Sequence, residues 1–314
     1  MLLPSEILSD MAELRAQLRT QGHLHRSLLR LNLAWPLLDL GFDVLVVVAS
    51  VAAVAWVSPW LAPLALVVIG NRQRALGNIL HDAGHRNLCR DGRINDALAR
   101  ALVAPLLFTS LTRYRETHWQ HHLALGRRLH DPDLLEIPSK PPQHWLTSYQ
   151  RHLCNGAAWW GSFAGHLASS EVALSSKVFI VLWWTAVLAL LQAAGGAHFA
   201  MVFAVLWLLA RGSVFHLITT MREMCDHYGL RPGGIFSFTR DMDCRGVWRE
   251  LFHPRNNGYH LTHHLLPAVP YYRLPEAHRM FRATAAYRTK AKVCDGYFAG
   301  RTAVVRDWQD VACP

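Results

Sequence analysis

The sequence predicts an all-α integral membrane protein, in which four transmembrane helices carry a helical cap that holds a histidine-rich di-metal site. Three observations support this fold class. Hydrophobic residues make up 52% of the 314 residues and charged residues only 17%, below the quarter that is usual in soluble domains. Two pairs of long apolar segments are separated by polar stretches. Histidine occurs 19 times, and eight of these residues fall in three tight clusters.

The first apolar pair lies near the N-terminus. Residues 37–57 form a 21-residue apolar run that is long enough to cross a bilayer. Apolar character continues, and one straight helix over 37–70 would be about 50 Å long, against a hydrocarbon core of about 30 Å. Because Pro59 offers a break, we expect a hairpin with a second helix at about 60–80. Arg72 would lie near the end of that helix and reach the lipid head groups.

The second apolar pair consists of residues 177–194 and 197–217, joined at Gly195-Gly196. Between the two pairs, residues 98–112 are apolar but too short to cross comfortably, so a buried or interfacial helix is expected there. Two hairpins make four crossings. Both termini and all three histidine clusters then lie on one side of the membrane.

The distribution of charge indicates which side this is. The net charge is +10, and basic residues gather before the first apolar run and in the long polar stretches. The two short turns at 57–63 and 194–197 carry no basic residue. This asymmetry is typical of a membrane protein whose positive segments stay in the cytosol. Nucleic-acid binding is disfavoured, because no module of basic and aromatic residues is visible.

The chain is therefore predicted to be one membrane domain over residues 1–314. Its cytosolic cap would be built from about 81–176 and 222–314, and both termini would also lie in the cytosol. The membrane would be a bacterial inner membrane or the endoplasmic reticulum.

The histidine clusters have spacings that suit metal ligands. Residues three and four apart lie on one face of a helix, so each cluster would point two or three imidazoles the same way. A single histidine is usually a surface or packed residue, but three clusters on one predicted face of a membrane indicate ligands. The clusters are His81-Asp-Ala-Gly-His85, His118-Trp-Gln-His121-His122 and His260-Leu-Thr-His263-His264.

The ligand type narrows the choice of metal. Imidazole suits zinc, copper, iron and nickel. Eight histidines are too many for one ion, and no cysteine, the usual partner in structural zinc sites, lies within the clusters. Two redox-active ions fit better and would suit O₂ activation at a membrane surface. Asp82, Glu116 and Asp226 are candidates to orient the rings, or else are solvated surface charges.

The order of the clusters resembles that of the membrane fatty-acid desaturase family. The resemblance extends to their surroundings, at Arg72-Gln73 and residues 78–85 (NILHDAGH) and, most specifically, at residues 257–275 (NGYHLTHHLLPAVPYYRLP). With gaps, the similar stretches run from about residue 37 to residue 282.

The resemblance implies a four-helix membrane domain with a cytosolic cap, two iron ions, and O₂ as co-substrate. It also implies a ninth histidine ligand between the last membrane helix and the third cluster, where His227 is the matching residue. Some relatives place an asparagine near a metal through water. Asn256 and Asn257 are both candidates for that role.

The function predicted in this way is desaturation of a fatty acyl lipid, in which hydrogen is removed from an unactivated methylene and a C=C bond forms. A hydroxylase or ketolase acting on an acyl chain, an alkane or a carotenoid is the first alternative, because histidine spacing does not report the outcome. A non-catalytic membrane metal-binding protein is a more distant alternative. No electron-carrier motif is visible, so an external donor of the ferredoxin, rubredoxin or cytochrome b5 type is expected.

Overall fold

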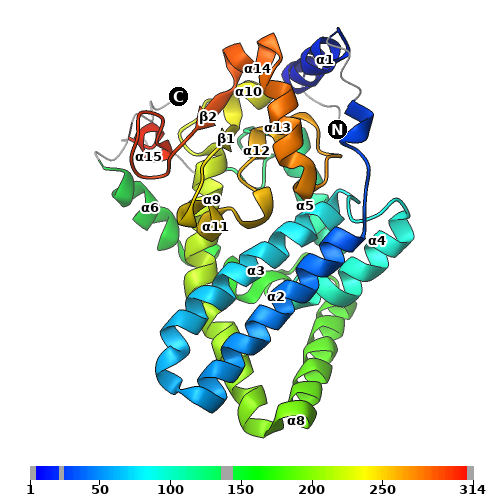
Figure 1. The fold of residues 1–314 in the computed structure, drawn as a ribbon, viewed down its shortest axis with the longest axis vertical. Coiled ribbons are helices and arrows are strands. Elements are labelled where there is room, and N and C mark those ends of the chain that lie inside the picture. The colour runs from blue at the N-terminus through cyan, green and yellow to red at the C-terminus, as the bar shows by residue number, and fades with distance from the viewer. Residues whose placement is uncertain (1–4, 21–24, 136–143, 310–314) are drawn as a thin grey trace. The chain divides into compact units, whose positions relative to one another are not determined.

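The computed structural model describes residues 5–20, 25–135 and 144–309, and these are mostly helical, as the sequence predicts (Figure 1). The chain divides into two compact units. The first, here called the histidine unit, comprises residues 1–31, 115–151 and 221–314; the second, here called the apolar unit, comprises 32–114 and 152–220. The prediction of one membrane domain over the whole chain stays a prediction.

The apolar unit is built around long helices joined by short helical turns. Helix α5 (Leu111–Ala124) and helix α9 (His216–His227) begin in this unit and end in the other. The remaining elements are α2 Ala34–Ala52, η2 Ala53–Val57, η3 Pro59–Leu61, α3 Ala62–Gly84, α4 Gly92–Leu98, η4 Ala99–Val103, η5 Pro105–Leu107, α7 Gly156–Ala164, η6 Gly165–Leu167, α8 Leu174–Ala210 and η7 Arg211–Phe215.

Two stretches of the described chain are long and apolar enough to cross a membrane, namely Ala34–Val57 and Leu174–His227. Few of their residues are buried within the protein, unlike those of a core helix in a soluble domain. The second stretch is not one straight rod. Gly196 has φ 84° and ψ 167°, a conformation open essentially only to glycine, and it breaks α8 at the position where the sequence predicts a turn.

Helix α3 differs from the expected second membrane span. It covers Ala62–Gly84, close to the predicted 60–80, but it is not among the helices apolar enough to qualify as a span. Many residues of its C-terminal half are buried, including the polar Gln73 and Asn78. Four crossings and the cytosolic side therefore remain predictions. Both ends of the chain, at residues 1–4 and 310–314, lie outside the described part.

Arg72 does not reach outward as the sequence analysis expects. Its Nη1 donates to Oδ1 of Asp43 at 3.0 Å, and the Asp43 side chain is fully buried on α2. A similar contact joins α3 to α8, where Gln73 Nε2 donates to the backbone oxygen of Trp207 at 2.9 Å. A polar group in an apolar surrounding is stable only with a partner, so these contacts join α3 to its neighbours.

The helices also approach closely at Gly70. A Cβ atom there would lie 2.7 Å from Cβ of Val214, which no ordinary packing allows. Glycine is thus required for α3 to lie against η7 at this point.

The histidine unit contains shorter elements around its own core. Strands β1 (Arg240–Met242) and β2 (Lys292–Cys294) pair in parallel, with Arg240 opposite Lys292. Besides the ends of α5 and α9, its other elements are α1 Ser5–Thr20, η1 His25–Ser27, α6 Trp145–Leu153, α10 Ile235–Phe238, α11 Val247–Phe252, η8 Pro254–Asn256, α12 His260–Leu265, η9 Tyr271–Arg273, α13 Leu274–Arg282, α14 Ala285–Lys290 and α15 Val304–Asp307.

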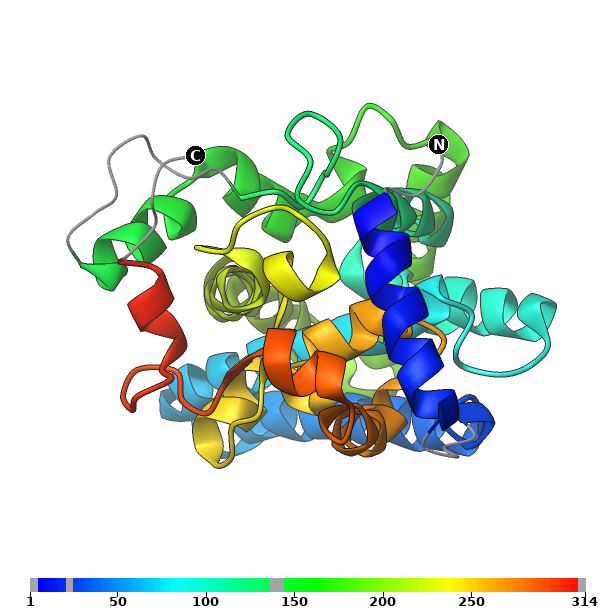
Figure 2. The ribbon, with the colours of Figure 1, turned by 90° about the horizontal axis from the view of Figure 1, so that it is seen from above.

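Helix α1 covers the core of this unit. It lies against α10, α13 and α14, as the view from above in Figure 2 also shows for the blue and orange helices. Its buried Ile7, Leu14 and Leu18 recur at roughly helical spacing, so one face enters the core. Asp10 on the same helix accepts hydrogen bonds from the backbone N–H groups of Ile235 and Phe236, at 2.7 and 3.2 Å, and so caps α10.

We expect Asp43→Leu to destabilise the protein by about 3–5 kcal/mol, because it leaves the guanidinium of Arg72 without its partner in an apolar surrounding. The double variant Asp43→Leu/Arg72→Leu should recover most of this loss, since no charge then remains. Thermal unfolding of the purified protein in detergent checks both. An additive loss in the double variant would contradict a coupled pair.

Candidate metal centre

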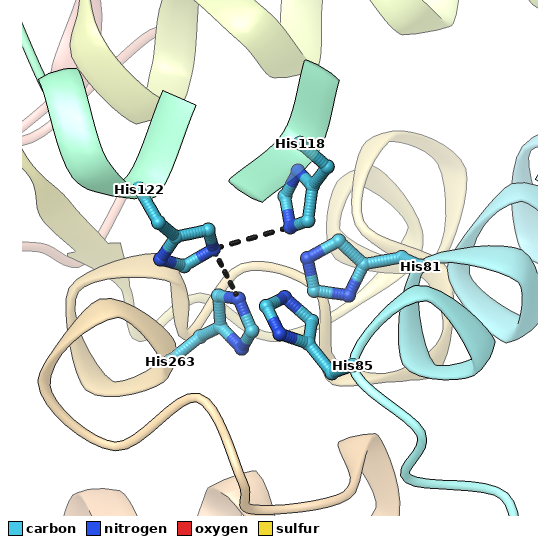
Figure 3. Close-up of side chains that lie close together, drawn as sticks. All are labelled: His81, His85, His118, His122 and His263. Carbon is cyan, nitrogen blue, oxygen red and sulfur yellow. Dashed lines mark hydrogen bonds between the residues drawn. The ribbon is translucent and has the colours of Figure 1, made fainter. Parts of the chain in front are cut away.

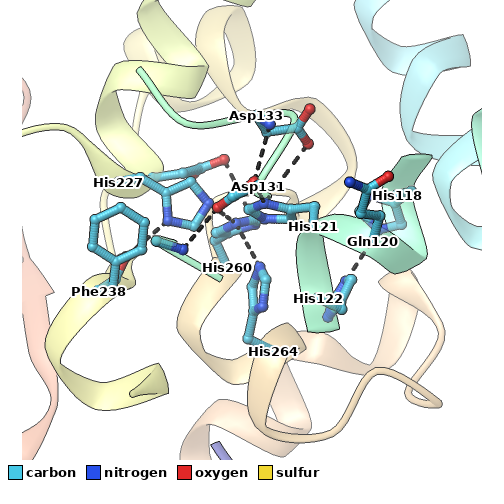
Figure 4. A network of polar contacts seen from close by, with 12 residues as sticks. His118, Gln120, His121, His122, Asp131, Asp133, His227, Phe238, His260 and His264 are labelled. Atoms are coloured by element: carbon cyan, nitrogen blue, oxygen red, sulfur yellow. Dashed lines mark hydrogen bonds and ion pairs between the residues drawn. The ribbon is translucent and has the colours of Figure 1, made fainter. Parts of the chain in front are cut away.

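Four buried histidines of the histidine unit converge on one point, here called the first histidine group. His121 comes from α5, His227 from the end of α9, and His260 and His264 from α12 (Figure 4). Each ring offers one ligand nitrogen, and these four nitrogens all lie within 4.8 Å of one another. Three segments that are distant in sequence therefore supply one cluster of imidazoles.

The outer nitrogens of two of these rings are held by the surrounding protein. His227 Nδ1 donates to the backbone oxygen of Phe238 at 2.8 Å, and His121 Nδ1 lies 2.7 Å from Oδ1 of Asp131. A carbonyl only accepts, so Nδ1 of His227 carries the proton and the lone pair of Nε2 faces the cluster.

The inner nitrogens are close to one another. His260 Nε2 lies 2.9 Å from Nε2 of His227 and 3.0 Å from Nε2 of His264. Burial lowers the pKa of both His260 and His264 well below the usual value, so both rings are neutral at physiological pH. At this separation two imidazole nitrogens either share a proton in an N–H···N hydrogen bond or direct both lone pairs at a bound cation. The donor set thus fits a metal ion that prefers nitrogen ligands.

Asp131 is a site residue that sequence reasoning missed. Its buried carboxylate also accepts from the backbone N–H groups of Gly126, at 2.8 Å, and Asp133, at 3.0 Å. Burial disfavours a charged His121 ring, but the hydrogen bond with Asp131 and the charges of Asp133 and Asp131 outweigh this and raise the pKa of His121. The acidic pair Asp131 and Asp133, which follows His130, was the feature of the sequence that could have identified this residue.

The three carboxylates chosen from the sequence have different surroundings. Asp226 is buried, with Oδ2 at 3.5 Å from Nδ1 of His260, and Arg222 Nε lies 2.7 Å from the same oxygen in an ion pair. Asp82 is also buried, 3.6 Å from Nδ1 of its neighbour His81. Glu116 is exposed on α5.

Three further histidines of the same unit form a second histidine group. His122 Nε2 lies 3.1 Å from Nε2 of His118, and His263 Nε2 lies 3.2 Å from Nε2 of His122 (Figure 3). All three side chains are buried. Figure 3 also draws His81, on α3 of the apolar unit, and His85, directly after the end of that helix; their ring centres are 4.9 Å apart.

The second and third sequence clusters are each divided between the two groups. On α5, His118 and His122 enter the second group, whereas His121 enters the first. On α12 the division is reversed, because His260 and His264 enter the first group and His263 the second. In both helices the pair four residues apart shares a face, and the remaining histidine points elsewhere. Each of these two clusters therefore points two imidazoles the same way, within the two or three that the spacing predicts.

The matching family model is that of the fatty acid desaturases, and it covers residues 24–293. The chain belongs to the fatty acid desaturase family. It is accordingly an oxidoreductase of the desaturase type and a membrane-associated protein, and the resemblance found in the sequence is confirmed.

Two characterised relatives are desaturases. The dihydrorhizobitoxine desaturase of Bradyrhizobium elkanii is 28% identical over 278 residues, covering 82% of this chain and 78% of that protein. The chloroplastic sn-2 acyl-lipid omega-3 desaturase (ferredoxin) of Helianthus annuus is 26% identical over 273 residues, covering 75% of this chain. The matched region spans 59% of the length of the Helianthus protein.

The two asparagines considered as water-mediated ligands of the desaturase both contact arginines. Asn257 Oδ1 accepts from Nε of Arg222 at 3.0 Å. Asn256 accepts from Arg249 and donates to the backbone oxygen of Tyr271, the latter at 3.2 Å. The choice between them stays open.

A buried carboxylate on β1 fixes the helix that carries the third cluster. Asp241 accepts from the backbone N–H of Thr262 at 3.0 Å and from its hydroxyl at 2.5 Å, in the middle of α12. His278 Nδ1 lies 2.8 Å from the same carboxylate, and the hydroxyl of Tyr287 also donates to it. His278 thus supports α12 and belongs to neither histidine group.

Asp131→Asn should lower the metal content of the purified desaturase and its activity about 10- to 100-fold, because the negative charge beside His121 is lost and an amide N–H replaces one of the two oxygens that accept hydrogen bonds. Metal analysis of the purified chain checks this. Asp133→Asn is the matched control, since its half-exposed carboxylate lies 3.9 Å from His121 and should matter far less. Equal losses in both variants would contradict a specific role for Asp131.

Asp241→Asn should lower the free energy of unfolding by at least about 2 kcal/mol and should also reduce metal retention. The reason is that the amide nitrogen of asparagine cannot accept the hydrogen bonds that the carboxylate accepts. Tyr287→Phe removes one of these hydrogen bonds and should cost about 1 kcal/mol. Asp243→Asn, whose side chain is 31% exposed, serves as the control. Unchanged stability in Asp241→Asn would show that the network does not hold α12.

Proposed function

We propose that this enzyme is an O₂-dependent di-iron desaturase that introduces a C=C bond into the acyl chain of a lipid. One iron would be held by the first histidine group. The second would be held by the second histidine group together with His81 of α3 and His85, which directly follows that helix. The ligand set is then His81, His85, His118, His121, His122, His227, His260, His263 and His264.

The single observation that carries this proposal is the convergence of neutral imidazole nitrogens within about 3 Å of one another around His260. Such a set, together with family membership, supports iron rather than a hard cation such as magnesium, which prefers oxygen ligands. Two iron ions so held would supply the oxidising power needed to remove hydrogen from an unactivated methylene.

The residues around the ligands orient the rings and exclude water. Asp131 and the Phe238 carbonyl keep the ligand rings in one tautomer and orientation, and burial of the first group excludes bulk water. The reaction takes two hydrogens from the substrate and needs two further electrons and two protons to reduce O₂ to water. An external carrier of the ferredoxin, rubredoxin or cytochrome b5 type would supply the electrons, and ferredoxin stands in the name of the Helianthus relative.

A four-crossing arrangement of a single membrane domain is part of the proposal. The break of α8 at Gly196 supports it by dividing the apolar stretch into two arms, and the length of α3 allows a further crossing. The histidine side and both termini would face the cytosol, as the distribution of basic residues suggests.

An acyl lipid is the proposed substrate because of the family and the Helianthus relative, whose name specifies an acyl lipid. The name of the Bradyrhizobium relative specifies dihydrorhizobitoxine instead. A hydroxylase or ketolase acting on an acyl chain, alkane or carotenoid would begin with the same hydrogen removal, so the mass of the product must decide.

Expression with an electron donor in a host of known lipid profile should yield lipids that have lost two hydrogens. His121→Ala should abolish this product, since it removes a proposed ligand. His130→Ala, which changes an exposed histidine nine residues further along the chain, should leave it intact. Mass spectrometry of the extracted lipids and iron analysis, with about two iron per chain expected, check the proposal.

The other outcomes are informative. Gain of one oxygen would replace desaturation by hydroxylation and leave the metal site in place. Unchanged lipids with two iron per chain would overturn the acyl-lipid substrate, and absence of iron in a stably folded chain would overturn the ligand set.

A further inference from the structure

A cavity of about 430 Å³ lies within the apolar unit, between the η4–η5 region and the beginning of α8. The polar residues of its lining, here called the rim, come from two segments. Arg100, Thr109 and Thr112 contribute from the segment around η4 and η5, and Ser175 and Ser176 contribute from the first turn of α8. The volume falls in the range of small-molecule sites.

The rim is rich in hydrogen-bond donors and carries positive charge. Among the described residues that line it, Arg100 is the only one with a charged side chain. Its Nη2 lies 3.4 Å from the hydroxyl of Thr112, which places the guanidinium at the rim. The nearby carboxylate of Glu171 pairs with Arg113 and does not line the cavity. Guanidinium and hydroxyl groups together suit an anion with several acceptor oxygens.

The other lining residues include several apolar side chains. Phe179 and Ile180, about one turn further along α8 than the two serines, line the cavity together with Leu111. The indole N–H groups of Trp183 and Trp184 donate to the backbone oxygens of Ala101, at 2.7 Å, and Pro105, at 2.8 Å. These bonds hold the η4–η5 region against α8, so the cavity has a fixed wall.

The change from polar to apolar lining follows the start of a helix that is long and apolar enough to cross a membrane. A phospholipid has the same sequence of groups, with an anionic phosphate above an apolar chain.

We propose that this cavity binds a membrane phospholipid, with its phosphate against Arg100 and the hydroxyl rim and the start of its acyl chain against Phe179. Nothing assigned to the histidine groups takes part in this site. The inference depends on membrane association alone and stands or falls independently of the proposed reaction.

The test is lipid retention by the purified full-length chain. The protein is reconstituted with equal amounts of phosphatidylglycerol and diacylglycerol of the same chain length, and bound lipid is counted by native mass spectrometry. Phosphatidylglycerol should be retained over diacylglycerol. Arg100→Gln should lower its retention about five-fold, because one cationic contact near a lipid surface is lost.

Two further variants make the result specific. Arg93→Gln, which removes an exposed arginine on α4 outside the cavity, should retain lipid as the unaltered chain does. Ser176→Asp places a negative charge on the rim and should expel phosphatidylglycerol while leaving diacylglycerol unaffected. Equal retention of phosphatidylglycerol by all three variants would overturn the proposal.

Thermal unfolding distinguishes a site for a phospholipid from a site for a free anion. Phosphatidylglycerol should raise the melting temperature of the unaltered chain but not that of Arg100→Gln, and inorganic phosphate alone should have little effect on either. An equal rise with inorganic phosphate alone would mean a site for free phosphate and would overturn the lipid assignment.

Discussion

The structure of the histidine unit depends on burying several imidazole nitrogens next to one another. His260 Nε2 has two such neighbours at 2.9 and 3.0 Å, an arrangement that needs either a shared proton or a bound cation between the nitrogens. The surrounding contacts serve this constraint. Phe238 and Asp131 hold the outer nitrogens of His227 and His121, and burial keeps the rings of the first group out of water.

The same constraint accounts for the carboxylate beneath α12. A helix of six residues has little stability of its own, yet α12 carries three of the clustered histidines. Asp241 holds its middle through Thr262, and His278 and Tyr287 complete the network around that carboxylate. A short helix can thus present histidines to two groups on different faces, because its backbone is anchored from the side opposite to the ligands.

The apolar unit obeys a related rule. Its helices expose apolar side chains outward, and its few inward polar groups are joined in pairs, as Arg72 is to Asp43 and Gln73 to the Trp207 carbonyl. Where the polar and apolar linings meet, at the start of α8, the cavity near Arg100 combines both characters. In both units, a polar group that is removed from water is stabilised by a partner, which is either another side chain or a backbone carbonyl.

The sequence by itself determined the helical class, the apolar segments, the turn at Gly196 and the three clusters of histidines, because helical periodicity, glycine conformation and residue type are local properties. It did not reveal the division of each H-x-x-H-H cluster between two groups, the roles of Asp131 and Asp241, or the partner of Arg72. These depend on which segments meet in space. Only the tertiary structure decided them, since the burial that forces a polar group to find a partner exists only once distant segments have packed together.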